Sequence, residues 1–444
     1  MNTPIADFVK EYAEKNMTRF HMPGHKGKER LGCEEYDITE VKGADALYEA
    51  EGIIAESEEH ARELFGTGRT VFSTEGSSQC IRAMMYLVVN EHKGTGRPVV
   101  LAARNVHKAF LYAAALVDFD VKWLLPEEMN SLCSCKISPE MVEKALSEME
   151  EKPAAVYITS PDYLGGQADI AGIAEVCHRY GTILAVDNAH GAYLHFLNTP
   201  VHPIDLGADI CCDSAHKTLP VLTGGAYLQI SKQAPESFAK NAKRAMILFG
   251  STSPSYLILS SLDLCNRYLS KTYRGRLAYM VEQIRKAKTM LREQGWNIEE
   301  TEELKITIKV PDALGGVKLA ELLRNNNIEC EYADDKYLVC MISPENYAEE
   351  LEYLVDSLGE NVYGETSDVY MSPLKSKQEL SIRSAIFAEH EMIPVEESVG
   401  RICGSPFISC PPAIPVVISG EVISEEAVKI FQYYGIDRVE VIKN

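Results

Sequence analysis

The stretch GADICCDSAHKTLPVLTGG, residues 207–225, decides how the rest of the chain is interpreted. Ser214, His216 and Lys217 stand together in it, between apolar residues and a glycine-containing turn. Apolar flanks predict partial burial of the Lys217 amine, which lowers its pKa and frees the neutral nucleophile needed to bond a carbonyl carbon. A single lysine after a strand is more often simply exposed, so this interpretation depends on the neighbouring motifs.

A second motif lies upstream, where the apolar run TILAV, residues 182–186, is followed by Asp187 and the segment 188–191. A continuous apolar run is typical of a strand buried on both faces, and an acid at its carboxyl end lies where open parallel sheets bind ligands. Asp187 is then placed to hold the protonated ring nitrogen of pyridoxal phosphate. Such an acid is more often a helix cap or a turn residue, but together with Lys217 it indicates a cofactor site.

A third motif is suited to binding an anion. The strand TVFST, residues 70–74, runs through Glu75 into Gly76, Ser77 and Ser78 and then into an apolar helix over 81–89. Free backbone amides and the dipole at a helix start attract negative charge, and the two hydroxyls add donors. Alone, this motif is usually just a helix cap. Together with the lysine and the acid it predicts the binding site of the cofactor phosphate.

Strand and helix signals alternate over residues 51–270, which predicts a mainly parallel sheet with helices on both faces. From Trp296 the pattern changes to short alternating strands and helices rich in lysine and glutamate, which indicates a smaller α+β domain. Near the end, the sequence predicts helices over 378–388, 395–400 and 424–434 and a strand close to 439–442.

Composition and charge exclude several classes of protein. The 444 residues carry a net charge of −21, which argues against a surface for nucleic acid or anionic lipid. Twelve cysteines show no zinc-type spacing and are expected to be reduced thiols, and His21 with His25 supplies too few ligands, so no metal is predicted. Because there is no apolar core of a signal peptide and no long apolar run, we expect a cytoplasmic protein that binds no membrane.

Taken together, these motifs resemble the ornithine/lysine/arginine decarboxylases of pyridoxal-phosphate fold type I. The resemblance covers nearly the whole chain. It rests on SAHKTLP (214–220), VDNAHG (186–191), FHMPGHKG (20–27), RNVHK (104–108) and STSPSY (251–256), and near the end on CPPAIP (410–415) and SGE (419–421). The family fold implies an aspartate-aminotransferase-like large α/β domain with a mainly parallel seven-stranded sheet, followed by smaller C-terminal α+β domains.

The resemblance also implies how the chain is divided. We expect an N-terminal helix and a loop at the active site and dimer interface over 1–50, and a large cofactor domain over 51–270. A small α+β domain over 271–360 and a C-terminal decarboxylase-type domain over 361–444 follow. The sequence shows no long amino-terminal wing like that of the large acid-induced members, so we expect the short form. The chain is expected to form a homodimer or higher homo-oligomer.

The family assigns roles to individual residues. Lys217 bonds pyridoxal phosphate, His107 stacks on one face of its ring and Ala189 packs on the other. The segment 251–253 crosses to the neighbouring chain and contacts its cofactor phosphate, so an active site needs two chains. The expected cofactor-binding set is Lys217, Asp187, Ala189, His107, Gly76, Ser77, Ser78, Ser214, His216, Ser251, Thr252 and Ser253.

The implied reaction is decarboxylation of a basic L-amino acid, giving CO2 and the corresponding amine of the polyamine pathway. The short form favours arginine or lysine as substrate, and ornithine stays open. The expected catalytic residues are Lys217, His216, His190 and His107. Either His216 or His190, or Lys217 itself, is suited to return a proton to the product, because histidine works as an acid near neutral pH. The sequence leaves this choice open.

Two other classes of function stay open. Another fold type I reaction, such as transamination or β-elimination, would be favoured by an arginine clamp on the substrate carboxylate, for which Arg383 and Arg401 are candidates. A non-catalytic protein on this scaffold is the second alternative, although the retained cofactor motifs argue against it. Two residues depart from the family pattern: Asp162, and Asn188 where members usually carry glutamate. Both leave the identity of the substrate open.

Overall fold

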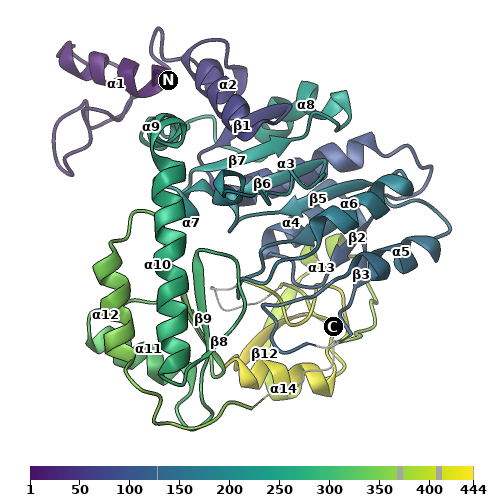
Figure 1. Ribbon diagram of the computed structural model, residues 1–444. Coiled ribbons are helices and arrows are strands. Elements are labelled where there is room, and N and C mark those ends of the chain that lie inside the picture. Colours follow the sequence, from purple (N-terminus) through teal and green to yellow (C-terminus); the bar gives the residue numbers. More distant parts are fainter. Residues whose placement is uncertain (128, 368–373, 407–412, 444) are drawn as a thin grey trace. The chain divides into compact units, whose positions relative to one another are not determined.

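The computed structural model describes residues 1–127, 129–367, 374–406 and 413–443 (Figure 1). The chain forms two compact units, Met1–Lys93 with Ile170–Arg276 and Gly94–Asp169 with Leu277–Asn444. Residues 410–412 of the family-like stretch CPPAIP lie outside the described residues. Within the described ranges, no helix is both long and apolar enough to cross a lipid bilayer.

The large sheet contains seven strands in the order β1-β7-β6-β5-β4-β2-β3. The first unit contributes β1 (Arg69–Ser73), β7 (Ala226–Ile230), β6 (Ile210–Asp213) and β5 (Ile183–Asp187). β5 and β6 are parallel, whereas β7 is antiparallel to both β1 and β6. Nearly all residues of these strands are buried. This explains why β5 (ILAVD) and β6 (ICCD) are continuous apolar runs up to their final acid.

Helices of the first unit pack on these strands and on one another. α3 (Gly76–Glu91) contacts β1, β5, β6 and β7. α2 (Ile53–Phe65) ends at Gly66, whose left-handed φ of 66° suits a glycine after a helix. α9 (Tyr256–Lys271) packs against α1 (Pro4–Glu14) and α2. The unit also contains η1 (Leu47–Glu49), α6 (Ile170–Arg179), η2 (Ala192–Phe196), α7 (Ala215–Thr218) and α8 (Glu236–Ile247).

The second unit contributes the remaining strands of the large sheet. β2 (Val99–Ala103) pairs in parallel with both β3 (Asp120–Leu124) and β4 (Ala155–Thr159). α4 (Lys108–Val117) connects β2 to β3, and α5 (Pro139–Ser147) connects β3 to β4. This alternation confirms the predicted mainly parallel seven-stranded sheet.

A separate small sheet follows α10 (Tyr273–Glu293). Its strands, β8 (Asn297–Ile298), β9 (Lys305–Lys309), β10 (Tyr332–Ala333) and β11 (Tyr337–Met341), lie in the order β10-β11-β9-β8 with antiparallel pairing. α11 (Gly316–Asn325) contacts β10 and β11, and α12 (Ala348–Leu358) completes this part of the chain. The change of pattern at Trp296 therefore does mark a small α+β fold.

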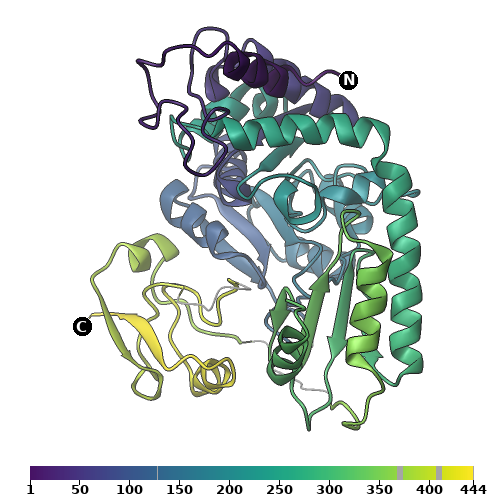
Figure 2. The same ribbon diagram turned by 90° about the vertical axis from the view of Figure 1, so that its left-hand side faces the viewer.

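The last part of the chain holds β12 (His390–Pro394) and β13 (Arg438–Ile442), which lie side by side and antiparallel in Figure 2. α14 (Glu425–Tyr433) matches the predicted helix. Of the two helices predicted before it, the one over 378–388 exists but is shorter, as α13 (Ile382–Ile386). The one over 395–400 was wrong, since that range holds only η3 (Val395–Glu397). At the start of this range the backbone continues the pairing of β12 with β13, since the Val395 amide donates to the Asp437 carbonyl at 2.9 Å.

Candidate active site

Lys217 lies on α7, the single helical turn that follows β6. The turn begins at Ser214, whose carbonyl accepts the Lys217 amide at 3.0 Å. The lysine is half-buried, as its apolar flanks predicted, and its Nζ lies 3.1 Å from Nε2 of His190. His190 follows the adjacent parallel strand β5 and is only 5% exposed. Parallel pairing of the two strands thus brings an amine and an imidazole together at one edge of the sheet.

Asp187 ends β5 at the same edge and is 2% exposed. Its Oδ1 accepts the amide of Ala189 at 3.2 Å and the thiol of Cys212 at 3.5 Å. Strand register places Asp187 opposite Cys212, the residue before the end of β6. Two neighbouring strands therefore hold this carboxylate in one orientation, close in the fold to the segment that carries Lys217.

The start of α3 and the start of α7 meet through their serines. The Ser214 hydroxyl donates to the Ser77 hydroxyl at 2.7 Å. Gly76 has a φ of 71°, and its amide donates to the carbonyl of Gly224 at 2.7 Å, which fixes the turn before the helix. Ser77 and Ser78 are the next residues of the first turn of this sixteen-residue helix. Hydroxyls, amides and the positive end of a helix dipole are grouped here, as a phosphate requires.

His216 is held in a different way from His190. Its Nδ1 donates to the carbonyl of Gly225 at 3.0 Å. Burial lowers the pKa of His216, and the nearby charge of Lys217 lowers it further, while the bond to Gly225 opposes the shift. The neutral ring is therefore favoured. Of the two histidines predicted beside the lysine, His190 is the one that contacts the lysine nitrogen through a hydrogen bond.

The exposed segment 251–253 lies before α9. The Ser251 amide donates to the carboxylate of Glu75, the residue that precedes α3, and the Ser253 amide donates to the Ser251 hydroxyl at 3.1 Å. These hydroxyls thus lie near the start of α3 of their own chain and are open to solvent.

Asn188, one of the two departures from the family pattern, is fully buried below the site. Its Nδ2 donates to Oδ1 of Asp213 at 2.6 Å. Asp213 also accepts from Gln229 at 3.0 Å and lies 3.1 Å from Nε2 of His202. His202, Cys211 and Asp213 are close enough to one another to hold a metal ion, but the Asp213 oxygens are already engaged by amide donors. Sequence reasoning missed this network, although Asp213 directly precedes Ser214.

Asp162, the other departure, lies in the second unit and holds its own loop together. Its Oδ1 accepts the amide of Gly166 at 2.8 Å, and burial raises the pKa of its carboxyl group. The fully buried Lys305 donates to the carbonyls of Asp162 and Tyr163 at 3.1 and 3.2 Å. In this structure the departure therefore has a structural explanation, since the carboxylate closes a turn.

His107 also lies in the second unit, at the carboxyl end of β2. It is the N-cap of α4, and its Nδ1 accepts the amide of Ala109 at 3.1 Å. An accepting Nδ1 places the proton of the neutral ring on Nε2. The ring is therefore fixed to the first turn of α4, and its direction follows the direction of that turn.

The other predicted candidates have local partners. Arg383 donates to the Ala115 carbonyl at 2.5 Å, and Arg401 pairs with Glu391 at 2.6 Å. His21 contacts the Tyr12 hydroxyl at 2.6 Å, and His25 contacts Asp37 at 3.1 Å. Neither histidine belongs to a metal-binding cluster within the described part of the chain.

The donor set of the first unit fits pyridoxal phosphate. The cofactor needs an amine for its carbonyl carbon, an acid for its ring nitrogen and several donors for its phosphate. Lys217, Asp187 and the Ser77–Ser214 hydroxyl pair offer these groups on neighbouring strand and helix ends. The chemistry of these residues is thus the chemistry that the cofactor requires.

Comparison with known proteins decides the family. A sequence profile for the Orn/Lys/Arg decarboxylase major domain matches residues 3–313, and one for the C-terminal domain of the same family matches 357–439. The chain belongs to the Orn/Lys/Arg decarboxylase family. The predicted family and fold class are thereby confirmed, and with them a decarboxylase that acts on a basic amino acid and uses pyridoxal phosphate.

Relatives of this decarboxylase match it along most of their length. Arginine decarboxylase of Halalkalibacterium halodurans is 29% identical, over 95% of this chain and 91% of that protein. Arginine decarboxylase of Bacillus subtilis is also 29% identical, over 96% and 92%. Among solved structures, the lysine decarboxylase of Francisella novicida matches with a TM-score of 0.80 at 16% identity, over 99% of this chain and 81% of that one. This last likeness shows the shared fold.

Proposed function

We propose that this decarboxylase acts on L-arginine, with lysine as the next candidate and ornithine as the third. Relatives that carry the name arginine decarboxylase align with it over nearly the full length of both chains, which supports arginine. The observation that carries the chemistry is the contact of 3.1 Å between Lys217 and His190 at the strand edge where Asp187 ends β5.

Bound pyridoxal phosphate supplies the electron sink that accepts the electron pair left when the carboxylate departs. In the proposal, Lys217 bonds it through Nζ and Asp187 keeps a proton on its ring nitrogen. His107 and Ala189 contact the two faces of the ring. The proposed phosphate ligands are Gly76, Ser77, Ser78, Ser214 and His216, with Ser251, Thr252 and Ser253 supplied by a neighbouring chain.

We assign the return of the proton to the pair formed by Lys217 and His190. Nζ and Nε2 lie within hydrogen-bonding distance, so a proton passes between them without rearrangement of either side chain. The Nδ1 proton of His216 is already committed to the Gly225 carbonyl. This difference favours His190 over His216 for the transfer and assigns His216 to orientation within the site.

Transamination is disfavoured by the partners of its two candidate clamps. Arg401 forms an ion pair with Glu391 and also donates to the Ile442 carbonyl at 2.8 Å. Arg383 donates to a backbone carbonyl and lies over the ring of Phe387. Both guanidinium groups thus serve the packing of the second unit. No further carboxylate clamp was predicted from the sequence.

The expected assembly and location belong to this proposal as well. Phe20 and Leu31 are 94% and 88% exposed in the N-terminal loop, which supports burial of that loop against a second copy in a homodimer. The proposed cytoplasmic location is supported by the cysteines: the eleven in the described ranges form no disulfide, as is typical of cytosolic proteins. We also propose the division at 1–50, 51–270, 271–360 and 361–444; the start of the second matched range, 357–439, supports its last boundary.

The proposal is tested by comparing the wild type with Lys217→Ala, and with Lys232→Ala as a control at an exposed lysine of the same unit. An absorbance spectrum with pyridoxal phosphate is recorded first, followed by CO2 release from arginine, lysine and ornithine. We expect a band of lysine-bound cofactor and gas from arginine, both lost in Lys217→Ala and kept in Lys232→Ala. A normal band with an α-keto acid as product would support transamination; a band with neither product would support the non-catalytic alternative.

A further inference from the structure

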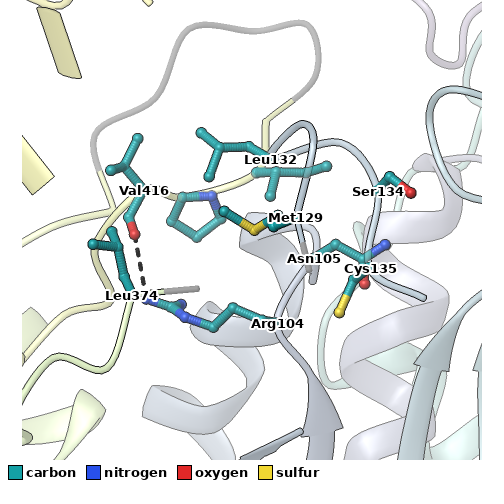
Figure 3. A pocket seen from close by; sticks show the side chains of 10 residues that line it. Arg104, Asn105, Met129, Leu132, Ser134, Cys135, Leu374 and Val416 are labelled. Carbon is teal, nitrogen blue, oxygen red and sulfur yellow. Dashed lines mark hydrogen bonds between the residues drawn. The ribbon is translucent and has the colours of Figure 1, made fainter. Parts of the chain in front are cut away.

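The turn that carries His107 is held by the segment 413–421, far away in the sequence. The amide of Lys108 donates to the carbonyl of Ala413 at 3.1 Å. Nη2 of Arg104 donates to the Val416 carbonyl at 3.3 Å and to Oε2 of Glu421 at 2.8 Å. Figure 3 shows the Arg104 side chain reaching toward the Val416 carbonyl. Contacts on both sides of His107 thus connect this turn to one segment of the same compact unit.

The ion pair at the centre of this contact is buried on both sides. Arg104 is 8% exposed and Glu421 is 3% exposed. Glu421 also accepts the amide of Ile418 at 2.8 Å, and the Arg104 guanidinium lies 5.1 Å from the ring centroid of Trp123. Burying two charges carries a desolvation cost, which good geometry and further hydrogen bonds offset. Removing one partner of such a pair is strongly destabilising, because it leaves the other charge uncompensated.

Outside 413–421, the Thr159 hydroxyl donates to the Asn105 carbonyl of this turn at 3.5 Å. Asn105 is 3% exposed, and neither its Oδ1 nor its Nδ2 has a hydrogen-bond partner within the described ranges. The same holds for Nη1 of Arg104. Both residues line a small cavity with Met129, Leu132, Ser134, Cys135, Leu374, Ile414, Pro415 and Val416 (Figure 3). The Asn105 side chain therefore contributes no hydrogen bond to the described protein, and the polar contacts with 413–421 come from Arg104 and Lys108.

We propose that Arg104 and Glu421 are positioning residues, through which the segment 413–421 orients His107 for its contact with the cofactor ring. The imidazole is fixed to the first turn of α4 by its bond to the Ala109 amide. A shift of the 104–108 turn therefore turns the ring as well. This inference rests on the role proposed above for His107, and it explains why the stretches RNVHK and SGE occur together in one chain.

The test is a double-mutant cycle with Glu421→Gln, His107→Ala and the combined variant. Glu391→Gln is the matched control, because Glu391 forms an ion pair with Arg401 in the same unit but none of its hydrogen bonds reaches 104–108. Affinity for pyridoxal phosphate is measured by titration of cofactor-free protein without substrate. We expect Glu421→Gln and His107→Ala each to weaken binding by about tenfold, a change of about 1.4 kcal/mol. The control should stay within about twofold.

The combined variant decides the inference. If Glu421 acts through His107, adding Glu421→Gln to His107→Ala changes the cofactor affinity no further. A further tenfold loss in the combined variant, or wild-type affinity in Glu421→Gln, would overturn the proposal. Should Glu421→Gln fail to fold, Arg104→Lys enters the same cycle, since lysine keeps the charge but loses the guanidinium Nη2 that donates to both the Val416 carbonyl and Glu421.

Hydrogen exchange in the cofactor-free protein separates this inference from the proposed function. Glu421→Gln should speed exchange of the Lys108 amide, and Glu391→Gln should not, whether or not the enzyme releases CO2. Unchanged exchange at Lys108 in Glu421→Gln would show that the pair of Arg104 and Glu421 does not hold the 104–108 turn. Faster exchange in a protein that binds no pyridoxal phosphate would support the contact between 104–108 and 413–421 and would reject the proposed decarboxylase function.

Discussion

The end of β6 and the end of β2 are organised in contrasting ways. At β6 the decisive contact joins Lys217 to His190, 27 residues earlier on the neighbouring parallel strand. At β2 the decisive contact joins Arg104 to Glu421, 317 residues later in the chain. The first region takes its geometry from strand pairing, and the second takes it from a distant segment. If the proposed roles hold, the reacting groups are placed locally, whereas the contact of His107 with the cofactor ring is adjusted from a distance.

The contrast predicts an order of effects. Removing a group at the β5 and β6 ends should eliminate a step of the reaction, because in the proposed function these side chains bond the cofactor or move the proton. Changing the Arg104–Glu421 pair after β2 should only misorient the proposed contact of His107 with the cofactor ring, which is still made. We therefore expect losses of activity to fall from Lys217 and Asp187, through His190, to Glu421.

The largest effect in this series, after loss of Lys217, is expected from Asp187→Ala. Without the carboxylate, a proton on the cofactor ring nitrogen loses its counter-charge, and the electron sink weakens. We expect kcat to fall by at least about a hundredfold, the scale of one lost preorganised electrostatic contact. Steady-state CO2 release with saturating cofactor measures it. A loss no larger than the loss in Glu421→Gln would remove the contrast between the two regions.

Asp209→Asn is the control for that variant. Asp209 is also a buried acid of the first unit, but it lies before β6, and its Oδ2 accepts the Leu184 amide at 2.8 Å. It therefore sits at the opposite end of the strands from Lys217. We expect its replacement to lower stability while kcat of the folded enzyme stays near the wild-type value.

A smaller effect is expected when the two histidines of the site are compared. His190→Gln keeps a hydrogen-bonding group near Nζ of Lys217 but cannot carry a proton, so kcat should fall by about a hundredfold or less, within the range of general acid catalysis. His216→Asn keeps a donor for the Gly225 carbonyl and should lower kcat by less than about tenfold. Equal losses, measured as kcat over a range of pH, would reject the assignment of the proton to His190.

The sequence predicted the region at the ends of β5 and β6 better than the region at the end of β2. The apolar strand ending in Asp187 and the one that precedes Lys217 could be recognised, because a buried parallel strand leaves a continuous apolar run. The partners of Asn188 could not, since the Asp213 network depends on side-chain directions that a pattern does not encode. The pairing of Arg104 with Glu421 was equally hidden, because each motif was recognised separately and nothing local connects them.

The strand β12 near the end was not predicted, for a similar reason. β12 is half-buried along its whole length, so it shows neither an apolar run nor an alternation. Its existence depends on pairing with β13, almost fifty residues later, where His390 lies opposite Ile442. Long-range strand pairing, rather than a local pattern, therefore determines this strand.

The smallest expected effect concerns stability and pH at His216. Burial lowers the pKa of the folded imidazole below the ordinary value, and the facing Lys217 charge adds to this. The unfolded chain then binds the proton at higher pH, near about 6.5. The contribution of His216 is therefore fully present above that pH and is lost as the pH falls toward the folded pKa. Urea unfolding of the cofactor-free protein at about pH 7.5 and 5.5 should show a larger drop for the wild type than for His216→Asn, which cannot titrate. An equal drop would mean that the ring keeps its ordinary pKa, and that the neutral form inferred for His216 is wrong.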